Sequence, residues 1–531
     1  MEPQVWSPAG GRTVGIVSVL TLAVAVFGYL REAALAARFG VSATMDAYFG
    51  AIFIPNVLYL ILIAGTLSTV FIPILLHDNA PDDPAKVSQT FSAVTNFVLL
   101  LFIGVVCCGV ITARAWFPLL FSGFASSTAE MAVRLMYIIF PAVLFLALAG
   151  IFTAVLNGFH KFALAAFAPT LSSVTVIAAA FLAPGDKAIY WVATATAAGF
   201  LLQALLLIPP IASLGIRYRP TLDLRHPAIL KVMRLGTPLF LYLVIANASA
   251  FLERNLASQI SAGAVSTLTY ATRLFAVPAN FLAAPLAIVA YPRFACEALR
   301  PRHGELRNQL SQMFRFVLFL FLPVTVWTML NALPLTRLLY EHGQFRPENS
   351  IVTARVLMLY SLGILPNALA IIMLRCFYAI QDTLTPLCVE LIDLAFYAVV
   401  ATLLSRHLGI QGLAITRAGA FFLVASLLLF VLGTQKRLLR IDLDLMRFIT
   451  RTAFASLVMG AVSWISLHVL QSAFDSGRTL MRMVVIGIVL LLSGAAFLGV
   501  ARLLKLREAK HILEIASHLV PANYFAYGDR E

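Results

Sequence analysis

The 531-residue chain is 61% hydrophobic and only 12% charged, with a mean hydropathy of +0.92. These values exclude an ordinary soluble domain and predict an all-α integral membrane protein. A net charge of +14 can indicate nucleic acid, but here the basic residues fall mainly in short connections between apolar segments. In that position they orient a membrane protein. We therefore expect a lipid bilayer, and no nucleic acid, as partner.

About 20 apolar residues cross a bilayer, and on this measure the sequence predicts fourteen transmembrane segments. The first ten residues are polar, lack a basic cluster and run directly into segment one, so no cleavable signal is expected. The predicted segments are 13–39, 44–76, 87–112, 128–156, 161–183, 188–214, 233–259, 264–292, 308–331, 351–378, 384–406, 410–434, 448–471 and 481–504.

Segments one and two carry charges that are expensive in hydrocarbon, so we expect these side chains to face a bundle interior or a water-filled cavity. They are Arg31, Glu32, Arg38 and Asp46. We also expect the two helices to be interrupted, as helices that line a transport cavity often are. The interrupting residues are Gly28, Gly40, Pro55 and Gly65.

Basic connections follow segments six, eight and twelve, with Arg219, Arg302 and Lys436 among their residues. In a fourteen-segment chain these connections and both termini lie on one side. The positive-inside rule assigns that side to the cytoplasm. We therefore expect a multi-pass protein of the bacterial cytoplasmic (inner) membrane with both termini cytoplasmic.

An internal repeat relates the two halves. A shift of 223 positions lays Arg31 on Arg254, Gly40 on Gly263 and Pro55 on Pro278. Six segments then repeat in the same orientation, as in transporters whose halves rock about a central site. The predicted divisions are an N-terminal lobe (1–225), a C-terminal lobe (226–440), and segments thirteen and fourteen with a cytoplasmic tail (441–531).

Catalytic signatures are missing from the sequence. The longest outer connections, 113–127 and 332–350, are short, and we find no Ser/His/Asp set, no metal triad and no phosphate-cradling glycine loop. The five cysteines lack metal-ligand spacing. We therefore expect a transporter and not an enzyme, with no cofactor.

Six ordered motifs carry a resemblance. They are GYLREAALAARFG from Gly28, MDAYFGAIFIPN from Met45, LNGFHKFALAAFAPTL from Leu156, LASQISAGAVSTLTYATRLFAVP from Leu256, LYEHGQF from Leu339 and FYAIQDTLTP from Phe377. The chain resembles the MurJ/MviN family of lipid-linked oligosaccharide flippases, within the multidrug/oligosaccharidyl-lipid/polysaccharide exporter superfamily.

That resemblance implies a function in cell-wall biogenesis and cell shape. Family members move lipid II, the undecaprenyl-pyrophosphate-linked peptidoglycan precursor, from the inner to the outer leaflet. It also implies a lipid-linked oligosaccharide substrate, a monomer and the cell-wall synthesis machinery as partner.

The resemblance assigns Arg31 and Arg273 to the family's cavity arginines and Asp46 to its cavity aspartate. Guanidinium suits this cargo, because it binds phosphate in a bidentate fork that lysine cannot reproduce. The alternative is that each arginine neutralises a nearby acid, for example Arg31 with Asp46.

The sequence departs from the family pattern at three places where typical lipid II flippases carry arginine. Here those places hold Ala25, Tyr59 and Leu60. Either another cation supplies the lost charge, or the cargo is another polyprenyl-linked sugar such as an exopolysaccharide repeat unit. The substitute cations are Arg254, Arg375 and Arg12. A multidrug exporter is the weaker alternative, since it predicts an acidic, aromatic pocket.

Glu390 and Asp393 lie three residues apart and share a face of segment eleven. Oxygen ligands suit a hard cation, so this pair could hold a monovalent coupling cation of the kind the family is thought to use. Pairing with Arg375 or Arg417 is the alternative. Membrane potential could also supply the direction of transport.

Overall fold

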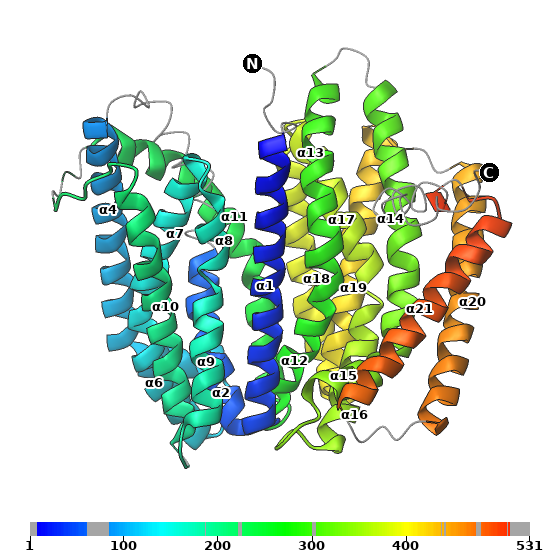
Figure 1. Ribbon diagram of the computed structural model, residues 1–531, viewed down its shortest axis with the longest axis horizontal. Coiled ribbons are helices and arrows are strands. Elements are labelled where there is room, and N and C mark those ends of the chain that lie inside the picture. Colours follow the sequence, from blue (N-terminus) through cyan, green and yellow to red (C-terminus); the bar gives the residue numbers. More distant parts are fainter. Residues whose placement is uncertain are drawn as a thin grey trace, which may run out of the picture. The chain divides into compact units, whose positions relative to one another are not determined.

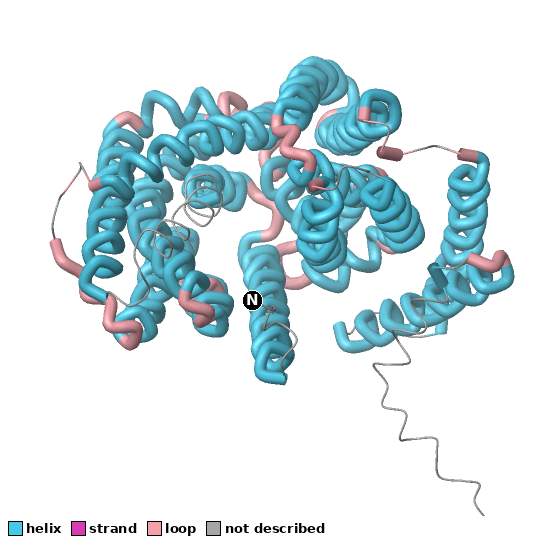
Figure 2. Tube along the Cα trace, turned by 90° about the horizontal axis from the view of Figure 1, so that it is seen from above, coloured by secondary structure: helices cyan, strands magenta, loops and turns pink. Residues whose placement is uncertain are grey.

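The computed structural model describes residues 8–60, 84–185, 187–220, 223, 226–299, 304–436, 438–439, 442–473, 479–506 and 508–509. Every regular element in that part of the chain is a helix (Figures 1 and 2), which confirms the predicted all-α class. Helices are what apolar segments of this length must form in a bilayer, because no water is present to satisfy exposed backbone groups.

The chain forms two compact units. Unit 1 comprises Met1–Thr269 with Tyr340–Asn349, and unit 2 comprises Tyr270–Leu339 with Ser350–Glu531. Unit 1 thus contains the seventh predicted segment as well as the first six. The predicted lobe boundary at 225/226 stays a prediction, because it was drawn from the sequence repeat, whereas the two units are defined by how compactly the chain packs.

The helices of unit 1 are α1 (Pro8–Phe39), α2 (Ala43–Tyr59), α4 (Pro84–Ile111), α5 (Ala113–Leu120), α6 (Ser126–Ile139), η3 (Phe140–Ala142), α7 (Val143–Gly158), α8 (Phe162–Phe167), α9 (Thr170–Leu182), α10 (Ala188–Ala212), α11 (Pro227–Ser258) and the first turns of α12 (Ala264–Pro278). Within this unit α7 packs against both α4 and α10, and α9 packs against α1 and α10 (Figure 1).

Unit 2 continues α12 and adds η4 (Ala279–Ala283), α13 (Ala284–Ala298), α14 (Gly304–Leu330), α15 (Ala332–Tyr340), α16 (Pro347–Ser361), α17 (Ile364–Ala379), α18 (Leu384–Leu408), α19 (Ile410–Phe430), η5 (Val431–Gln435), α20 (Leu443–Ala473) and α21 (Thr479–Leu503). Helix α17 packs against α13, α14 and α19, and α20 packs against α14 and α21.

Twelve of the fourteen predicted segments appear as spans. Eleven helices of the described residues are long and apolar enough to cross a membrane, and the bent pair α16 and α17 makes a twelfth. The two remaining predictions, 44–76 and 233–259, correspond to α2, which is described to Leu60, and to the 32-residue helix α11. The chain is therefore a multi-pass membrane protein.

Among the described residues, the predicted interruption at Gly40 is confirmed, and those at Gly28 and Pro55 are wrong. Helix α1 runs without a break through Gly28 and ends at Phe39, before Gly40, whose φ is +60°. Pro55 lies inside α2, and Gly65 is outside the described residues. Other segments contain breaks that were not predicted, for example segments four and ten. The 3₁₀ turn η3 separates α6 from α7, and α16 meets α17 at an angle of 44°.

Turn geometry supports the internal repeat. Gly40 and Gly263 both have positive φ, and so do Gly185 and Gly409 in the turns that precede α10 and α19. The non-glycine residues His160 and Gln381 form a third pair, at φ of +58° and +59°.

The turns that contain His160, after α7, and Gln381, after α17, share the same hydrogen bond. Lys161 N–H donates to Leu156 O, and Asp382 N–H donates to Phe377 O, at 2.8 and 2.9 Å. Partners 221 positions apart thus adopt one local conformation, which composition alone would not produce.

Asp382 fastens the second of these turns. Its carboxylate accepts hydrogen bonds from the backbone N–H of Thr385 at 3.0 Å and from Lys436 Nζ at 2.8 Å. Burial raises the pKa of this carboxyl, but the bonds from Lys436 and Thr385 outweigh that effect and leave the pKa lowered. The carboxylate is therefore charged at neutral pH, and it joins the start of α18 to the end of η5.

Candidate functional site

Four of the six motifs meet at one place in unit 1, which we call the turn cluster: residues 37–46, 259–266 and 342–345. Gln344 N–H donates to Ala37 O at 2.8 Å. A Cβ on Gly343 would collide with Ala37 O, and a Cβ on Gly263 would lie 2.5 Å from Val41 Cγ1. Glycine is required at both positions, because each has positive φ and a neighbour in the way.

Asp46 lies at the centre of the turn cluster and is 1% exposed. Ser42 caps α2 through a bond from Met45 N–H, and this first turn directs Asp46 towards the start of α12. Its carboxylate oxygens accept backbone N–H bonds from Gly263 at 2.6 Å and from Ser266 at 2.7 Å. An anion is stabilised there, because the first N–H groups of a helix have no intrahelical acceptor.

Arg31 does not pair with Asp46 in this structure. Its Nη2 lies 2.8 Å from Oε1 of its neighbour Glu32, with the two side chains 21% and 3% exposed. The ion-pair partner of Arg31 is therefore Glu32 and not Asp46. One carboxylate oxygen engages a single nitrogen of the guanidinium, so the fork retains further donors for a phosphate.

Arg254 lies against α2. Its guanidinium carbon is 3.9 Å from the centre of the Phe53 ring, which packs edge-on against Phe251. Nη1 also donates to Ala250 O at 3.4 Å. Stacking holds this cation beside α2, the helix that carries Asp46.

The other two predicted arginines belong to unit 2. Arg273 is an exposed residue of α12, and Arg375 is a half-buried residue of α17. In unit 1, Arg254 lies against α2, the helix that carries Asp46. In unit 2, no described contact joins Arg375 to Glu390. The role of all five residues at the substrate stays a prediction.

The acidic pair on α18 lies near Arg417 of α19. Asp393 and Arg417 are buried, at 7% and 8% exposed, and Arg417 stacks over the Tyr397 ring at 3.9 Å. The charges of Asp393 and Arg417 both act on Glu390. Of the two arginines weighed as partners, the geometry favours Arg417. Within the described residues no group of three or more His, Cys, Asp or Glu could hold a metal ion.

Tyr59 and Leu60, two of the residues that depart from the family pattern, occupy different environments. Tyr59 packs against the buried cluster of Ala142, Leu146 and Phe200, whereas Leu60 is 46% exposed. An arginine at position 59 would therefore face apolar side chains in this chain.

Sequence reasoning missed the partners of Asp46. The bond to Gly263 spans 217 positions and the bond to Ser266 spans 220. One signal was available: Gly263 precedes an apolar segment at a helix start, and such a start needs an acceptor for its free N–H groups.

The chemistry of the site is that of closure and anion binding. A buried carboxylate fastens the start of α12, and arginines lie on α1 and α11. No set of side chains described above combines a nucleophile with a base, so the arrangement suits binding and movement of an anionic cargo.

Comparison with known proteins agrees with this arrangement. The family model described as "Lipid II flippase MurJ" matches residues 35–485. The "Lipid II flippase MurJ" of Burkholderia cenocepacia is 30% identical over 473 residues, which cover 86% of this chain and 90% of that protein.

Solved structures show the same fold. "Lipid II flippase MurJ, inward closed conformation" has a TM-score of 0.77 at 23% identity and covers 92% of this chain and 98% of its own. The inward-facing conformation of a multidrug resistance MATE family transporter of the MOP superfamily has a TM-score of 0.65 at 14% identity, covering 79% and 98%. The fold is thus shared with drug transporters, but the sequence match separates them, and the chain belongs to the lipid II flippase MurJ family.

Proposed function

We propose that this chain moves lipid II from the cytoplasmic to the periplasmic leaflet of the bacterial inner membrane by alternating access, for peptidoglycan biosynthesis. The observation that carries the proposal is the family match over residues 35–485. It supports a transport role, and that the chain is not an enzyme remains a prediction. The cell-wall synthesis machinery as partner, and a monomeric state, remain predictions.

In this proposal the pyrophosphate is held by guanidinium groups, with Arg31 and Arg273 as the first contacts and Arg254 and Arg375 as further cations. Arg31 supports the role because Glu32 engages it at one nitrogen only. Movement of charge along the membrane potential supplies direction, at about 2.3 kcal/mol per charge per 100 mV.

The turn cluster is the element that closes on one side of the membrane. Under the proposed topology it lies at the periplasmic ends of α1, α2 and α12. The glycine contacts and the Asp46 bonds hold these ends in register, so their separation is a defined step and not a gradual loosening.

The lipid tail would lie along α20 and α21. These helices pack together, and many of their exposed side chains are apolar, as is usual for a surface that faces hydrocarbon. Examples are Phe454, Leu457, Leu490 and Leu491. Binding of a coupling cation by Glu390 and Asp393 is a separate proposal, and Arg417 is the competing charge that such an ion would have to displace.

Topology can be tested by thiol labelling. Cysteines placed at Arg219 and at Gln435 should react with a membrane-permeant maleimide only, because the basic connections lie in the cytoplasm. The measurement is labelling of intact cells with permeant and impermeant reagents, with a cysteine at exposed Glu130 as the periplasmic control. If the impermeant reagent labels the cysteine at position 219 or 435, the predicted orientation is wrong.

The function itself is tested by complementation. A bacterium depleted of its own lipid II flippase should grow when it expresses this chain, and should lyse when it expresses an equally abundant Arg31→Ala variant. If the depleted bacterium lyses although it expresses the unmodified chain at normal abundance, the result would favour another polyprenyl-linked oligosaccharide as the cargo. That is the alternative raised by Ala25, Tyr59 and Leu60.

Binding by native mass spectrometry separates these cargoes directly. A preference of about ten-fold for lipid II over a lipid-linked glycan without the peptide corresponds to about 1.4 kcal/mol and would exclude the alternative. If the two bind equally, Ala25→Arg with Leu60→Arg should shift the preference towards lipid II. Position 59 is left unchanged because Tyr59 packs against a buried apolar cluster.

A further inference from the structure

Unit 1 contains an apolar cavity that the proposed transport does not use. It has a volume of about 470 Å³ and lies between α4, α7 and α10, beneath the segment that follows α10. Phe152 and Ile211 form part of its walls, and Ile208 lines it while remaining 46% exposed. The volume is in the range of ligand sites in proteins. Since its exposed rim lies on spanning helices, the cavity opens towards the bilayer.

A short extended segment after α10 is fastened across α4 by three polar side chains on one helix face. Arg217 N–H donates to Ser88 Oγ at 3.0 Å, and Arg219 N–H donates to Ser92 Oγ at 2.9 Å. Asn96 Nδ2 then donates to Arg219 O at 3.3 Å. Residues four apart on a helix present such groups in a row, so the segment is held in a fixed register.

Alternation along this segment separates apolar from charged residues. Ile216 and Tyr218 line the cavity, and Tyr218 Oη donates to Asn96 Oδ1 at 2.5 Å. The intervening residues Arg217 and Arg219 are exposed. The backbone that carries two cationic side chains is therefore fixed beside the cavity.

A third cation lies at the end of α10. Lys161 Nζ donates to Ser213 Oγ at 2.9 Å, and Ser213 follows Ala212, which lines the cavity. The three basic residues come from two connections that the proposed topology places in the cytoplasm. An apolar chamber at the depth of the inner leaflet thus has positive charge at its polar end.

We infer that this cavity binds one acyl chain of an anionic glycerophospholipid of the cytoplasmic leaflet, whose phosphate lies against Arg217, Arg219 and Lys161. Basic residues beside membrane-embedded pockets recognise anionic head groups in this way. A fatty acyl chain suits one chamber of this size, whereas an undecaprenyl chain is several times longer. The lipid would cover Ile216 and Tyr218 in the segment that follows α10.

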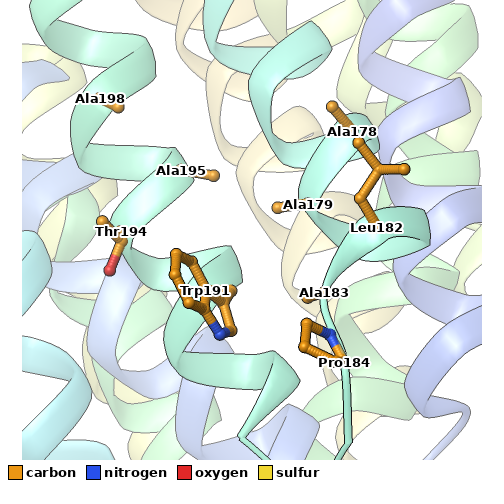
Figure 3. Close-up of a pocket in the computed structure, with 9 residues that line it drawn as sticks. All are labelled: Ala178, Ala179, Leu182, Ala183, Pro184, Trp191, Thr194, Ala195 and Ala198. Atoms are coloured by element: carbon orange, nitrogen blue, oxygen red, sulfur yellow. The ribbon is translucent and has the colours of Figure 1, made fainter.

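A second apolar pocket provides the comparison. It has a volume of about 400 Å³ and lies between α9 and α10, lined by small residues and Leu182, with Pro184 and Trp191 at one end (Figure 3). The nearby Arg38 donates to Ala183 O at 3.0 Å. This pocket has a similar volume without a row of exposed cations fixed beside it.

The test measures lipid binding to the purified full-length protein by native mass spectrometry, with phosphatidylglycerol and phosphatidylcholine of the same acyl chains. The wild type should prefer phosphatidylglycerol. Arg217→Gln with Arg219→Gln should weaken that lipid about ten-fold and leave phosphatidylcholine unchanged, because each cation near the membrane surface attracts anionic lipid. Ala212→Trp should weaken both lipids, because the indole fills the chamber.

Matched controls are Ala195→Trp in the α9–α10 pocket and Arg447→Gln with Arg451→Gln on α20, and neither should change binding. Ile208→Trp fills the cavity from another wall, so misfolding of one variant does not decide the result. Unchanged phosphatidylglycerol binding in the arginine variant, or in both tryptophan variants, would overturn the inference. Displacement of phosphatidylglycerol by lipid II in wild type, but not in Ala212→Trp, would assign the cavity to the substrate instead. The readout is binding, so it stands whether or not transport is observed.

Discussion

Replacing Arg31 by alanine should abolish lipid II transport while the protein still reaches the membrane in normal amount. The side chain pairs with Glu32 through one nitrogen and offers its remaining donors to the pyrophosphate. Charge-assisted bonds to phosphate are about twice as strong as neutral ones, and alanine removes them all. The measurement is the rate of lipid II exposure in the outer leaflet of proteoliposomes.

Two variants separate this role from a structural one. Arg31→Lys should restore only part of the rate, because a lysine keeps the charge but loses the bidentate fork. In Arg31→Ala the buried Glu32 loses this partner, which can itself cost about 3–5 kcal/mol. The double variant Arg31→Ala with Glu32→Gln removes that penalty, and it should remain inactive.

Arg134→Ala is the matched control. Arg134 pairs with Glu130 at 2.6 Å, but both side chains are 62% exposed, and such surface pairs contribute little. Its loss should leave transport unchanged. Full activity in the double variant at positions 31 and 32 would place Arg31 among the structural ion pairs.

The fold was largely predictable because a bilayer restricts what apolar segments can do. Length and hydropathy located twelve spans that the structure contains, since each must close its own backbone hydrogen bonds. Breaks within spans were less predictable. Gly28 sits in a continuous helix, because neighbouring turns of α1 maintain its hydrogen bonds, whereas a 3₁₀ turn follows Ile139 without any glycine.

The candidate site was predictable by residue type and not by partner. Costly charges in segments one and two marked Arg31 and Asp46 correctly as buried or half-buried. The choice of partner depends on distances that the sequence does not contain. Arg31 is satisfied by its own neighbour, while Asp46 finds its donors on a helix more than 200 positions away. Tyr59 shows the same limit, since only the structure reveals that it packs against a buried apolar cluster.

Asp46→Asn should open the turn cluster and stop transport. The carboxylate accepts two backbone N–H bonds, at 2.6 and 2.7 Å, while 1% exposed. Asparagine supplies one acceptor oxygen and turns an N–H donor towards a second N–H. Hydrogen bonds to a charged group contribute about 1.5–3 kcal/mol each, so the loss of one favours separation by roughly ten-fold to a hundred-fold.

The measurement is the reactivity of a cysteine at Val41, whose side chain lies against Gly263. An impermeant maleimide should label it at least ten-fold faster in Asp46→Asn than in the otherwise unchanged protein, as estimated from the lost bond. Glu130→Gln, which neutralises an exposed carboxylate, should leave the labelling rate alone. Gly263→Ala should reproduce the effect through backbone strain, because φ is +87° there and a Cβ would press on Val41.

Transport and labelling together decide what Asp46 does. If Asp46→Asn stops transport and speeds labelling, the carboxylate acts by fastening α12 and only indirectly on the cargo. If transport stops while Val41 labelling is unchanged in both Asp46→Asn and Gly263→Ala, the turn cluster does not depend on these bonds. Asp46 would then return to the substrate-binding role that its resemblance to the family's cavity aspartate implies.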